Sequence, residues 1–323
     1  MREVFLGVDG GGTKTHACVV DLYGNVLGTA ANGGANWERS GIGSVQKSLN
    51  EIIEAALRAA DVQRDEIVDS TFALAGIDWE EDQNLFIPVI KELGLQGRCT
   101  LINDSFAALF AGAPSGIGCV SIAGTGGKSA GRDGVRTVQT MGMDLGEGGG
   151  AGQLISLALE SIARSFHGIQ PRTALYTEFV QFMGFQDTKA FFTAIARDRI
   201  DPDESIAPLI FGLCTAGDTE AIKIASQVAK QHALDIYGIV NQLNFNSGSI
   251  PVVRAGGLHT ARNEIFDQAF ETELRSLLPL AAISVLNVAP VFGAVIHAAQ
   301  RHFTNAPDSF IKTLNIEAQK VAI

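Results

Sequence analysis

The 323-residue sequence has few cysteines, fewer basic than acidic residues and no long apolar run. Its four cysteines, Cys18, Cys99, Cys119 and Cys214, are far apart, and three lie in apolar, strand-like runs, which favours buried reduced thiols over a disulfide framework. Lysine and arginine number 24 against 35 aspartates and glutamates, and a net charge of −11 disfavours a broad nucleic-acid or anionic-membrane surface. No apolar run approaches the roughly twenty residues of a membrane span and no apolar signal region is seen, so we expect a cytoplasmic protein.

A glycine-rich turn near the start follows an apolar strand and reads Asp9-Gly10-Gly11-Gly12-Thr13-Lys14-Thr15. Glycines let the backbone approach a ligand closely, because no Cβ intervenes and positive φ is allowed, so N–H groups can point at phosphate oxygens. Thr13 and Lys14 would add a hydroxyl and a cation, and Asp9 is placed to hold a hydrated Mg²⁺. A tight hairpin turn between two apolar strands is the alternative that these residues leave open.

The first third of the chain shows an alternation of strand and helix patterns in the order β-β-β-α-β-α-β-α. Strands are expected at 4–9, 16–21, 26–31, 70–75 and 99–102, and helices at 44–60, 80–93 and 106–111.

The same pattern restarts after residues 113–116, with strands at 119–123, 128–132 and 136–140 and a second glycine-rich turn after the first of them. Helices are expected between about 152 and 245, then strands at 250–255 and 283–289 and a helix at 291–301. This duplication predicts two domains, residues 1–113 and 114–323, with the helical insertion in the second. Two such halves would offer both glycine-rich turns to one nucleotide in the cleft between them.

Four segments together resemble the acetate and sugar kinase, chaperone and actin superfamily: residues 9–15, Asn103-Asp104, 124–126 and 252–258. The motifs look most like the BadF/BadG/BcrA/BcrD-type ATPase family and its N-acetylglucosamine kinase branch. They read Val8-Asp9-Gly10-Gly11-Gly12-Thr13-Lys14-Thr15, Gly34-Ala35-Asn36-Trp37, Ile102-Asn103-Asp104 and Ile122-Ala123-Gly124-Thr125-Gly126. The resemblance runs from Val4 to about Arg301 and implies an α/β fold of two actin-like (ribonuclease H-like) domains.

This resemblance implies a nucleotide site for ATP and Mg²⁺. Asp9 would organise Mg²⁺ through water. The first phosphate loop would comprise Gly10, Gly11, Gly12, Thr13 and Lys14, the second Thr125 and Gly126, and the adenosine motif Gly256 and Gly257.

The resemblance also implies an acceptor site. Asp104 would accept the sugar hydroxyl proton as a general base. The alternative for Asp104 is a helix N-cap, because it directly precedes an apolar helical run, and both roles are compatible if a neighbour supplies the cap. Asn36, followed by Trp37, matches a sugar-contacting amide, although asparagine in a glycine-rich loop is otherwise an ordinary turn residue.

Residues 140–150 depart from the family pattern, because the family's Trp and His are missing. Glu147 stands where the sugar kinases carry a sugar-binding Asp, in a setting expected to be more flexible, and Gly142 belongs to the same expected sugar-binding segment. Lys128 follows the second loop, where it would either stabilise the transferring charge or be a solvated hairpin residue.

The expected function is transfer of the ATP γ-phosphoryl group to a hydroxyl of N-acetylglucosamine or a related amino sugar. The alternatives are an activator ATPase of a 2-hydroxyacyl-CoA dehydratase or benzoyl-CoA reductase system, which needs converging cysteines for an iron–sulfur cluster, and a non-catalytic sugar or nucleotide sensor. The six histidines show no metal-ligand spacing, so no metal beyond Mg²⁺ is expected. Monomer and homodimer both stay open.

Overall fold

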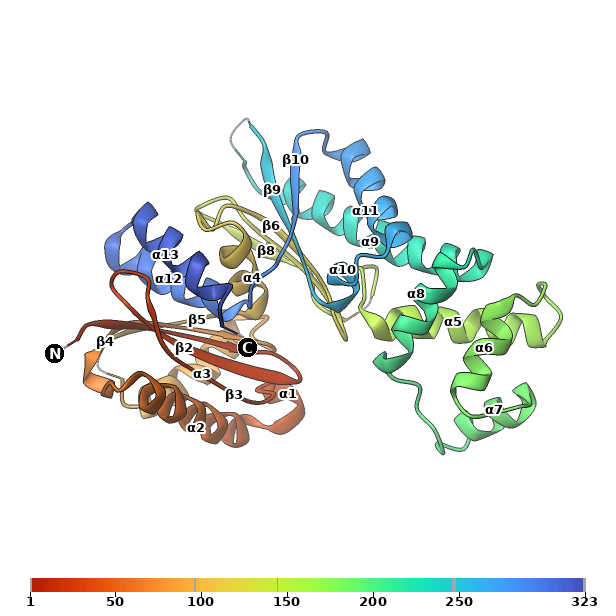
Figure 1. Ribbon diagram of the computed structural model, residues 1–323, viewed down its shortest axis with the longest axis horizontal. Helices are drawn as coiled ribbons and strands as arrows, with labels where there is room; N and C mark the ends of the chain where they lie inside the picture. Colours follow the sequence, from red (N-terminus) through yellow and green to blue (C-terminus); the bar gives the residue numbers. More distant parts are fainter. Residues whose placement is uncertain (1, 96, 144, 246–247, 322–323) are drawn as a thin grey trace. The chain divides into compact units, whose positions relative to one another are not determined.

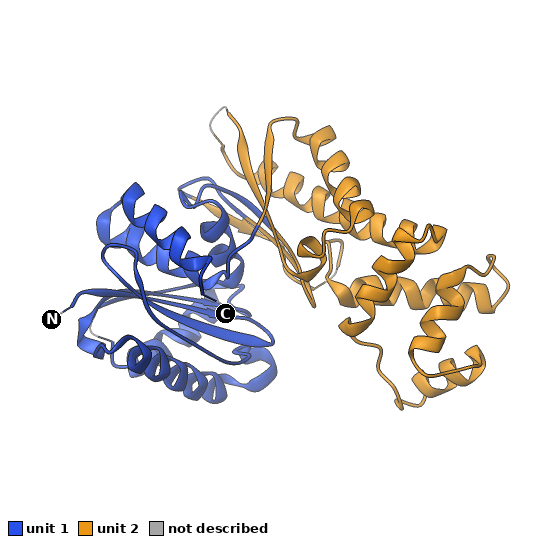
Figure 2. Cartoon of the chain, viewed as in Figure 1, with its two compact units in different colours: residues 1–120, 131–135, 286–323 blue, residues 121–130, 136–285 orange. Residues whose placement is uncertain are grey.

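The computed structural model describes residues 2–95, 97–143, 145–245 and 248–321 (Figure 1). The chain divides into two compact units (Figure 2). The first comprises the described residues within 1–120, 131–135 and 286–323, and the second those within 121–130 and 136–285.

The first unit contains a five-stranded mixed sheet in the order β3-β2-β1-β4-β5. Its strands are β1 (Val4–Gly10), β2 (Lys14–Asp21), β3 (Val26–Gly33), β4 (Ile67–Leu74) and β5 (Arg98–Asn103). β1, β2 and β3 form an antiparallel meander, whereas β4 and β5 run parallel to β1. The register pairs Gly10 with Leu74 and Leu74 with Asn103, so the carboxyl ends of β1, β4 and β5 share one edge of the sheet.

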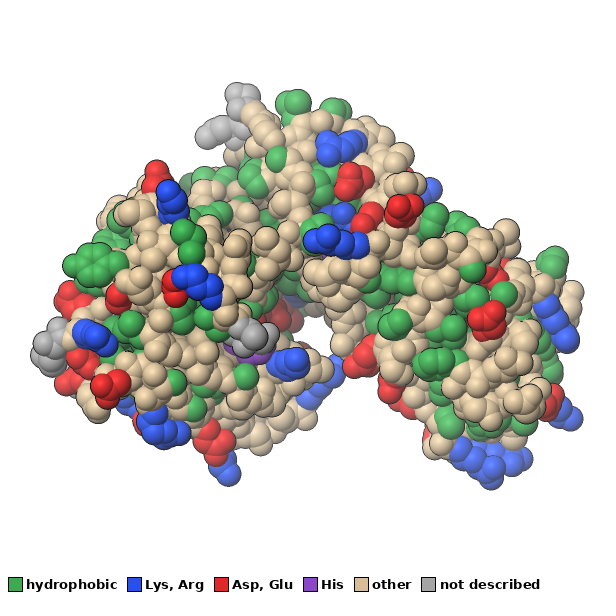
Figure 3. All heavy atoms as spheres, viewed as in Figure 1, with side chains coloured by type: hydrophobic (Ala, Val, Ile, Leu, Met, Phe, Trp, Pro, Cys, Tyr) green, Lys and Arg blue, Asp and Glu red, His purple; other side chains and the backbone are tan. Residues whose placement is uncertain are grey.

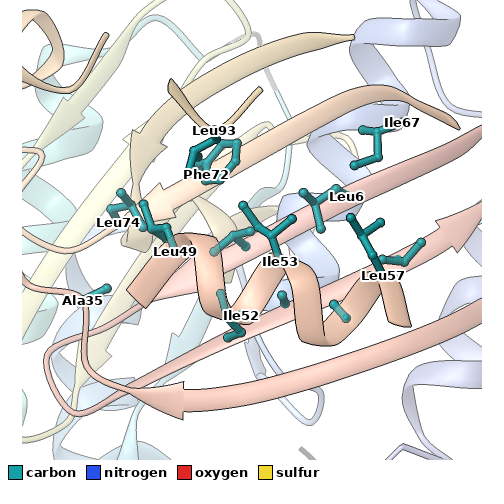
Figure 4. Close-up of a cluster of buried hydrophobic side chains, with 14 of the residues drawn as sticks. Leu6, Ala35, Leu49, Ile52, Ile53, Leu57, Ile67, Phe72, Leu74 and Leu93 are labelled. Atoms are coloured by element: carbon teal, nitrogen blue, oxygen red, sulfur yellow. The ribbon is translucent and has the colours of Figure 1, made fainter. Parts of the chain in front are cut away.

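Helices cover both faces of this sheet. They are α1 (Trp37–Ser40), α2 (Ile42–Ala60), α3 (Glu80–Glu92), α4 (Asp104–Gly112), α12 (Val291–Phe303) and α13 (Asp308–Ala318), with a 3₁₀ turn at Arg64–Glu66. Side chains alternate across β1: Leu6 packs with the apolar stripe of α2 (Figure 4), whereas Phe5 packs with α12 and α13 on the other face.

The expected boundary after residue 113 differs from this division, because residues 286–323 belong to the first unit. A β-carbon built on Gly7 of β1 would lie 2.6 Å from Val295 Cγ2, and one built on Gly293 would lie 1.8 Å from the carbonyl oxygen of Ala107. These glycines let α12 pack directly on β1 and α4, a long-range fit that the local pattern does not reveal.

The second unit repeats the strand arrangement, since its sheet has the order β10-β9-β6-β7-β8. The strands of this sheet are β6 (Gly118–Ala123), β7 (Gly127–Arg132), β8 (Thr137–Gln139), β9 (Ile250–Ala255) and β10 (Ala281–Val285), and one end of β6 and of β7 is counted with the first unit. In chain order they correspond to β1, β2, β3, β4 and β5 of the first sheet. The two sheets confirm the predicted pair of duplicated α/β domains.

Most helices of the second unit lie between β8 and β9 in the chain. The helices of this unit are α5 (Ala151–Phe166), α6 (Ala174–Phe182), α7 (Thr188–Ile195), α8 (Ala207–Thr215), α9 (Thr219–Gln242), α10 (Gly257–Thr260) and α11 (Glu264–Leu277), with a 3₁₀ turn at Glu204–Ile206.

On the face drawn in Figure 3, basic, acidic and hydrophobic side chains are interspersed over each unit. Within the described part of the chain, no helix combines the length and apolar character needed to cross a bilayer.

Candidate nucleotide and acceptor sites

The first glycine-rich turn closes the β1–β2 hairpin, with the Gly11 N–H donating a 2.9 Å hydrogen bond to the Lys14 carbonyl oxygen. Gly12, Thr13 and Lys14 are exposed, and a β-carbon on Gly12 would meet no atom within 4 Å. The three glycines have no positive φ. Gly10 is closely packed, because a β-carbon there would lie 2.6 Å from Leu74 Cδ2 and 3.0 Å from the Ala35 β-carbon. The turn is therefore a hairpin whose exposed tip has room for a ligand.

Two carboxylates lie at the adjoining edge of the sheet, Asp9 at the end of β1 and Asp104 at the start of α4. Burial is the larger cause and the negative charge of Asp104 the smaller, and together they raise the pKa of Asp9 to about 8. Two carboxylates close enough to repel each other form an oxygen-rich setting that a hard divalent cation stabilises. Asp9 and Asp104 therefore fit a hydrated Mg²⁺.

The N-cap of α4 is Asn103, whose side-chain oxygen accepts a 3.0 Å hydrogen bond from the Ser105 N–H. Asp104 is the first residue within the helix. The cap role that the sequence left open for Asp104 is therefore filled by its neighbour, and the base role stays a prediction.

Sequence reasoning missed the loop after β4, which lies beside this carboxylate edge. The Ala75 N–H donates to the Gly10 carbonyl oxygen at 2.8 Å, and Asp78 Oδ1 accepts a 2.8 Å hydrogen bond from Asn103 Nδ2. The available signal was the position of Gly76 and Asp78 just past a buried strand that is parallel to β1.

Asn36 and Trp37 adjoin the same loop. Asn36 is the N-cap of α1, and its Oδ1 accepts from the Glu38 N–H at 2.9 Å. Trp37 Nε1 donates to the Gly76 carbonyl oxygen at 2.7 Å, and a β-carbon on Gly76 would lie 3.2 Å from Asn36 Oδ1. The structure thus gives Asn36 a capping role and gives Trp37 a role in holding the β4 loop, while their contact with a sugar stays a prediction.

The second glycine-rich turn lies between β6 and β7, with Thr125 and Gly126 exposed at its tip. The Gly124 carbonyl oxygen accepts from the Ala151 N–H at 2.8 Å, which anchors the turn to the start of α5. Gly256 lies directly against its base, since a β-carbon there would be 2.5 Å from the Ala123 carbonyl oxygen, and its φ is +88°. The second glycine-rich turn and the Gly256-Gly257 pair are therefore adjacent within one unit, while their roles in binding phosphate and adenosine stay predictions.

Glu147 is buried, and its carboxylate holds the loop that precedes it. Oε2 accepts a 3.1 Å hydrogen bond from the Gly142 N–H, and Oε1 accepts one from the Met143 N–H. Burial opposes ionisation of Glu147, but these N–H groups, the Thr140 hydroxyl and the charge of Lys128 outweigh burial and lower its pKa.

The expected flexibility around Glu147 is wrong, because Gly148, Gly149 and Gly150 are buried and closely packed. A β-carbon on Gly127 would lie 1.9 Å from the Gly148 carbonyl oxygen, and one on Gly150 would lie 2.3 Å from that of Gly124. These glycines allow backbone to pack on backbone. Asp144, in the same segment, lies outside the described residues.

Lys128 lies beside the Gly142 turn, since a β-carbon on Gly142 would be 3.5 Å from Lys128 Nζ. Its positive charge acts on Glu147, a partner that neither of the two expected roles for Lys128 included.

The cysteines show no convergence in the described part of the chain. Cys18, Cys119 and Cys214 are buried free thiols, and Cys99 is partly buried. The described residues contain no group of three histidine, cysteine, aspartate or glutamate side chains suited to holding a metal ion. Burial raises the pKa of Cys119 to about 12, which keeps this thiol protonated.

Comparison with protein families matches residues 6–298 to the model of the BadF/BadG/BcrA/BcrD ATPase family. The chain belongs to this family. Among the similar proteins, the N-acetylmuramic acid/N-acetylglucosamine kinase of Clostridium acetobutylicum is 26% identical over 298 residues, which cover 91% of this chain and 97% of that protein. The N-acetyl-D-glucosamine kinase of Dictyostelium discoideum is 26% identical over 317 residues, or 92% and 98% of the two chains.

A solved structure that shares the fold is the ROK hexokinase of Thermus thermophilus, with a TM-score of 0.58 and 20% identity. The superposition covers 94% of this chain and 100% of the hexokinase. This likeness confirms the predicted actin-like, sugar-kinase fold.

Proposed function

We propose that this protein is an ATP-dependent kinase that transfers the γ-phosphoryl group to a hydroxyl of N-acetylglucosamine or a related amino sugar. Membership of an ATPase family and the two amino-sugar kinase relatives support the reaction class. The observation that carries the proposal is the carboxylate edge of the first unit, where Asp104 lies close enough to Asp9 to raise its pKa.

In this proposal each carboxylate has its own part. Asp104 accepts the proton of the attacking sugar hydroxyl, a role that requires hydrogen-bond reach rather than an unusual pKa. Asp9 holds Mg²⁺ through water, and when bound the ion neutralises charge on the phosphate oxygens.

The glycine-rich turns supply backbone and side-chain donors for phosphate. The exposed Thr13 and Lys14 of the first unit, and Thr125 and Gly126 of the second, bind the phosphate oxygens of ATP. Gly256 and Gly257 pack against the nucleoside. Asn36, Trp37, Gly142 and Glu147 belong to the sugar side of the proposal, with Glu147 acting through the backbone that it holds.

The test is a coupled ADP-release assay with MgATP over a panel of N-acetylglucosamine, N-acetylmuramic acid, glucosamine and glucose, with mass spectrometry of the sugar product. We expect an amino-sugar phosphate, and a loss of about 10²- to 10⁴-fold in kcat for Asp104→Asn. Asp308→Asn, an exposed carboxylate in α13 of the same unit, is the matched control and should retain full activity.

Three results would contradict the proposal. Full activity of Asp104→Asn removes the proposed base. Binding of sugar or nucleotide without any sugar phosphate favours a sensor, and a coloured, iron-containing protein favours an activator ATPase.

A further inference from the structure

A buried series of polar side chains lies beside the second phosphate loop. The hydroxyl oxygen of Ser121 on β6 is 3.0 Å from His232 Nδ1 and 3.0 Å from His259 Nε2. His259 Nδ1 accepts a 3.0 Å hydrogen bond from Arg254 Nε, and His232 Nε2 lies 2.9 Å from the Gly149 carbonyl oxygen. The four side chains are almost fully buried and come from β6, α9, β9 and α10.

The groups at the two ends fix the direction of each hydrogen bond. Arg254 can only donate, so Nδ1 of His259 is the acceptor and its Nε2 carries the proton. The Gly149 carbonyl can only accept, so His232 donates from Nε2 and its Nδ1 accepts from the Ser121 hydroxyl. Donation therefore runs in one direction, from Arg254 through His259, Ser121 and His232 to Gly149.

The cationic end of the series is neutralised by α11. The Arg254 guanidinium forms an ion pair with Asp267 and lies 3.5 Å from Glu271, and it also lies over the Phe270 ring at 5.2 Å. A buried charge with these partners has little freedom to move, which makes it a fixed anchor.

The other end of the series forms part of a contact between α9 and the glycine-rich segment. Gln231 Nε2 donates to the Gly146 carbonyl oxygen at 3.2 Å, and Asp235 Oδ2 accepts from the Gly148 N–H at 2.7 Å. The His232 ring lies directly on Gly148, where a β-carbon would be 2.6 Å from its Cγ. One face of α9 therefore holds the backbone of residues 146–149.

This backbone supports the second phosphate loop. Gly148 lies against Gly127, and Gly150 lies against Gly124 and Gly126, each close enough to exclude a β-carbon. The same series reaches the adenosine motif, because Arg254 and His259 flank Gly256 and Gly257 on β9 and α10.

We propose that Arg254, His259, Ser121 and His232 are positioning residues. They hold the second phosphate loop and the adenosine motif at fixed positions relative to each other, so that both can bind one ATP molecule. The proposal rests on the function proposed above, because it takes both glycine motifs as the nucleotide site. The four residues touch no reacting atom; they act through the backbone of Gly148–Gly150. Their removal is expected to weaken nucleotide binding while leaving sugar binding unchanged.

The test compares Ser121→Ala with Ser129→Ala. Ser129 is a fully buried serine on the neighbouring strand β7 whose hydroxyl has no hydrogen-bond partner among the described residues, so the two variants lose the same atom from the same sheet. Binding of the non-hydrolysable analogue AMPPNP with Mg²⁺ is measured by calorimetry, and KM for ATP and for the sugar are measured in the ADP-release assay.

We expect Ser121→Ala to raise the Kd for AMPPNP and the KM for ATP about tenfold, by analogy with the lower end of the effect of losing a hydrogen bond that supports a metal ligand. The KM for the sugar should not change, and Ser129→Ala should match wild type in all three. A second variant, His232→Gln, should shift the same two constants.

The outcomes separate this proposal from the proposed function. If wild type binds AMPPNP and Ser121→Ala binds it equally well, the positioning role is overturned while the kinase stands. An equal loss of AMPPNP affinity in Ser129→Ala also overturns the positioning role, because the loss is then a general effect of removing a buried hydroxyl from the sheet. If wild type neither binds nucleotide nor phosphorylates a sugar, the proposed function itself is wrong.

Discussion

Asn103 and Asp78 are joined by a 2.8 Å hydrogen bond from the Asn103 side-chain amide to Asp78 Oδ1. The Asn103 oxygen meanwhile accepts from Ser105 N–H and thereby caps α4. One amide thus ties the β4 loop to the helix that begins with Asp104. The orientation of Asp104 consequently depends on both the NH2 group and the carbonyl oxygen of the Asn103 side chain.

Asn103→Ala and Asn103→Asp should distinguish the effect of the helix cap from that of the hydrogen bond to Asp78. Alanine removes the cap and the donor, and we expect a stability loss of about 1 kcal/mol together with a lower kcat. Aspartate retains the capping oxygen but cannot donate to Asp78, and its charge adds to those of Asp78 and Asp104. Urea unfolding and the ADP-release assay check this: Asn103→Asp should lose kcat, and a wild-type kcat would show that the contact with Asp78 is dispensable.

Gly34→Ala should disturb the first glycine-rich turn, which we propose to bind phosphate. A β-carbon on Gly34 would lie 2.3 Å from the Gly12 carbonyl oxygen, so the loop or the end of β3 must shift. We expect a KM for ATP raised at least about threefold in the ADP-release assay, with a smaller change in melting temperature than a core substitution gives. Gly43→Ala in α2, where a β-carbon meets nothing within 4 Å, is the control and should behave as wild type.

Local patterns in the sequence predict most of the elements. The apolar stripe of residues 44–60 became α2 at Ile42–Ala60, and the strand expected at 4–9 became β1 at Val4–Gly10. Periodicity suffices there because neighbouring residues decide the structure. The expected helix at 291–301 is confirmed within α12, whereas α13 at Asp308–Ala318 was not predicted.

The supporting contacts of the candidate site could not be predicted, because they join residues far apart in the chain. His232 lies 111 positions from Ser121, and no local pattern pairs them. The contact of Glu147 with a sugar stays a prediction, but no local pattern indicates that its carboxylate accepts hydrogen bonds from the backbone N–H groups of Gly142 and Met143. Motifs therefore locate the loops, while the groups that hold them emerge only from tertiary packing.

Glu147→Gln should destabilise the protein. Glutamine replaces one accepting oxygen with a donor that faces a backbone N–H, and a buried unsatisfied group costs about 1 to 3 kcal/mol. Urea unfolding should show this loss with a wild-type m-value. Glu38→Gln, an exposed carboxylate in α1, is the control and should unfold as wild type does.

Three buried histidines should make stability fall as the pH is lowered from about 6.5 to 4. Burial lowers the pKa of His232 and His297 to about 4, and it lowers that of His259 well below its ordinary value. The unfolded chain therefore binds more protons than the folded chain in this window, so the free energy of unfolding rises with pH there. His297→Gln should show a shallower dependence than wild type in urea unfolding at pH 5, 6 and 7, and an unchanged slope would contradict the neutral, buried state of His297.

Asp9→Asn should stabilise the metal-free protein while abolishing activity. The folded pKa of Asp9 is raised to about 8, so the folded state holds a proton that the unfolded state releases above about pH 4. The contribution of Asp9 to stability is thus lost as the pH rises toward 8, by up to about 1.4 kcal/mol per pH unit. Asparagine carries no such charge, so in EDTA the melting temperature of Asp9→Asn should exceed that of wild type by a margin that grows from pH 5 to 8.

Adding Mg²⁺ should raise the melting temperature of wild type but not of Asp9→Asn, because the ion favours the ionised carboxylate. If Mg²⁺ stabilises both proteins equally, Asp9 does not organise the ion.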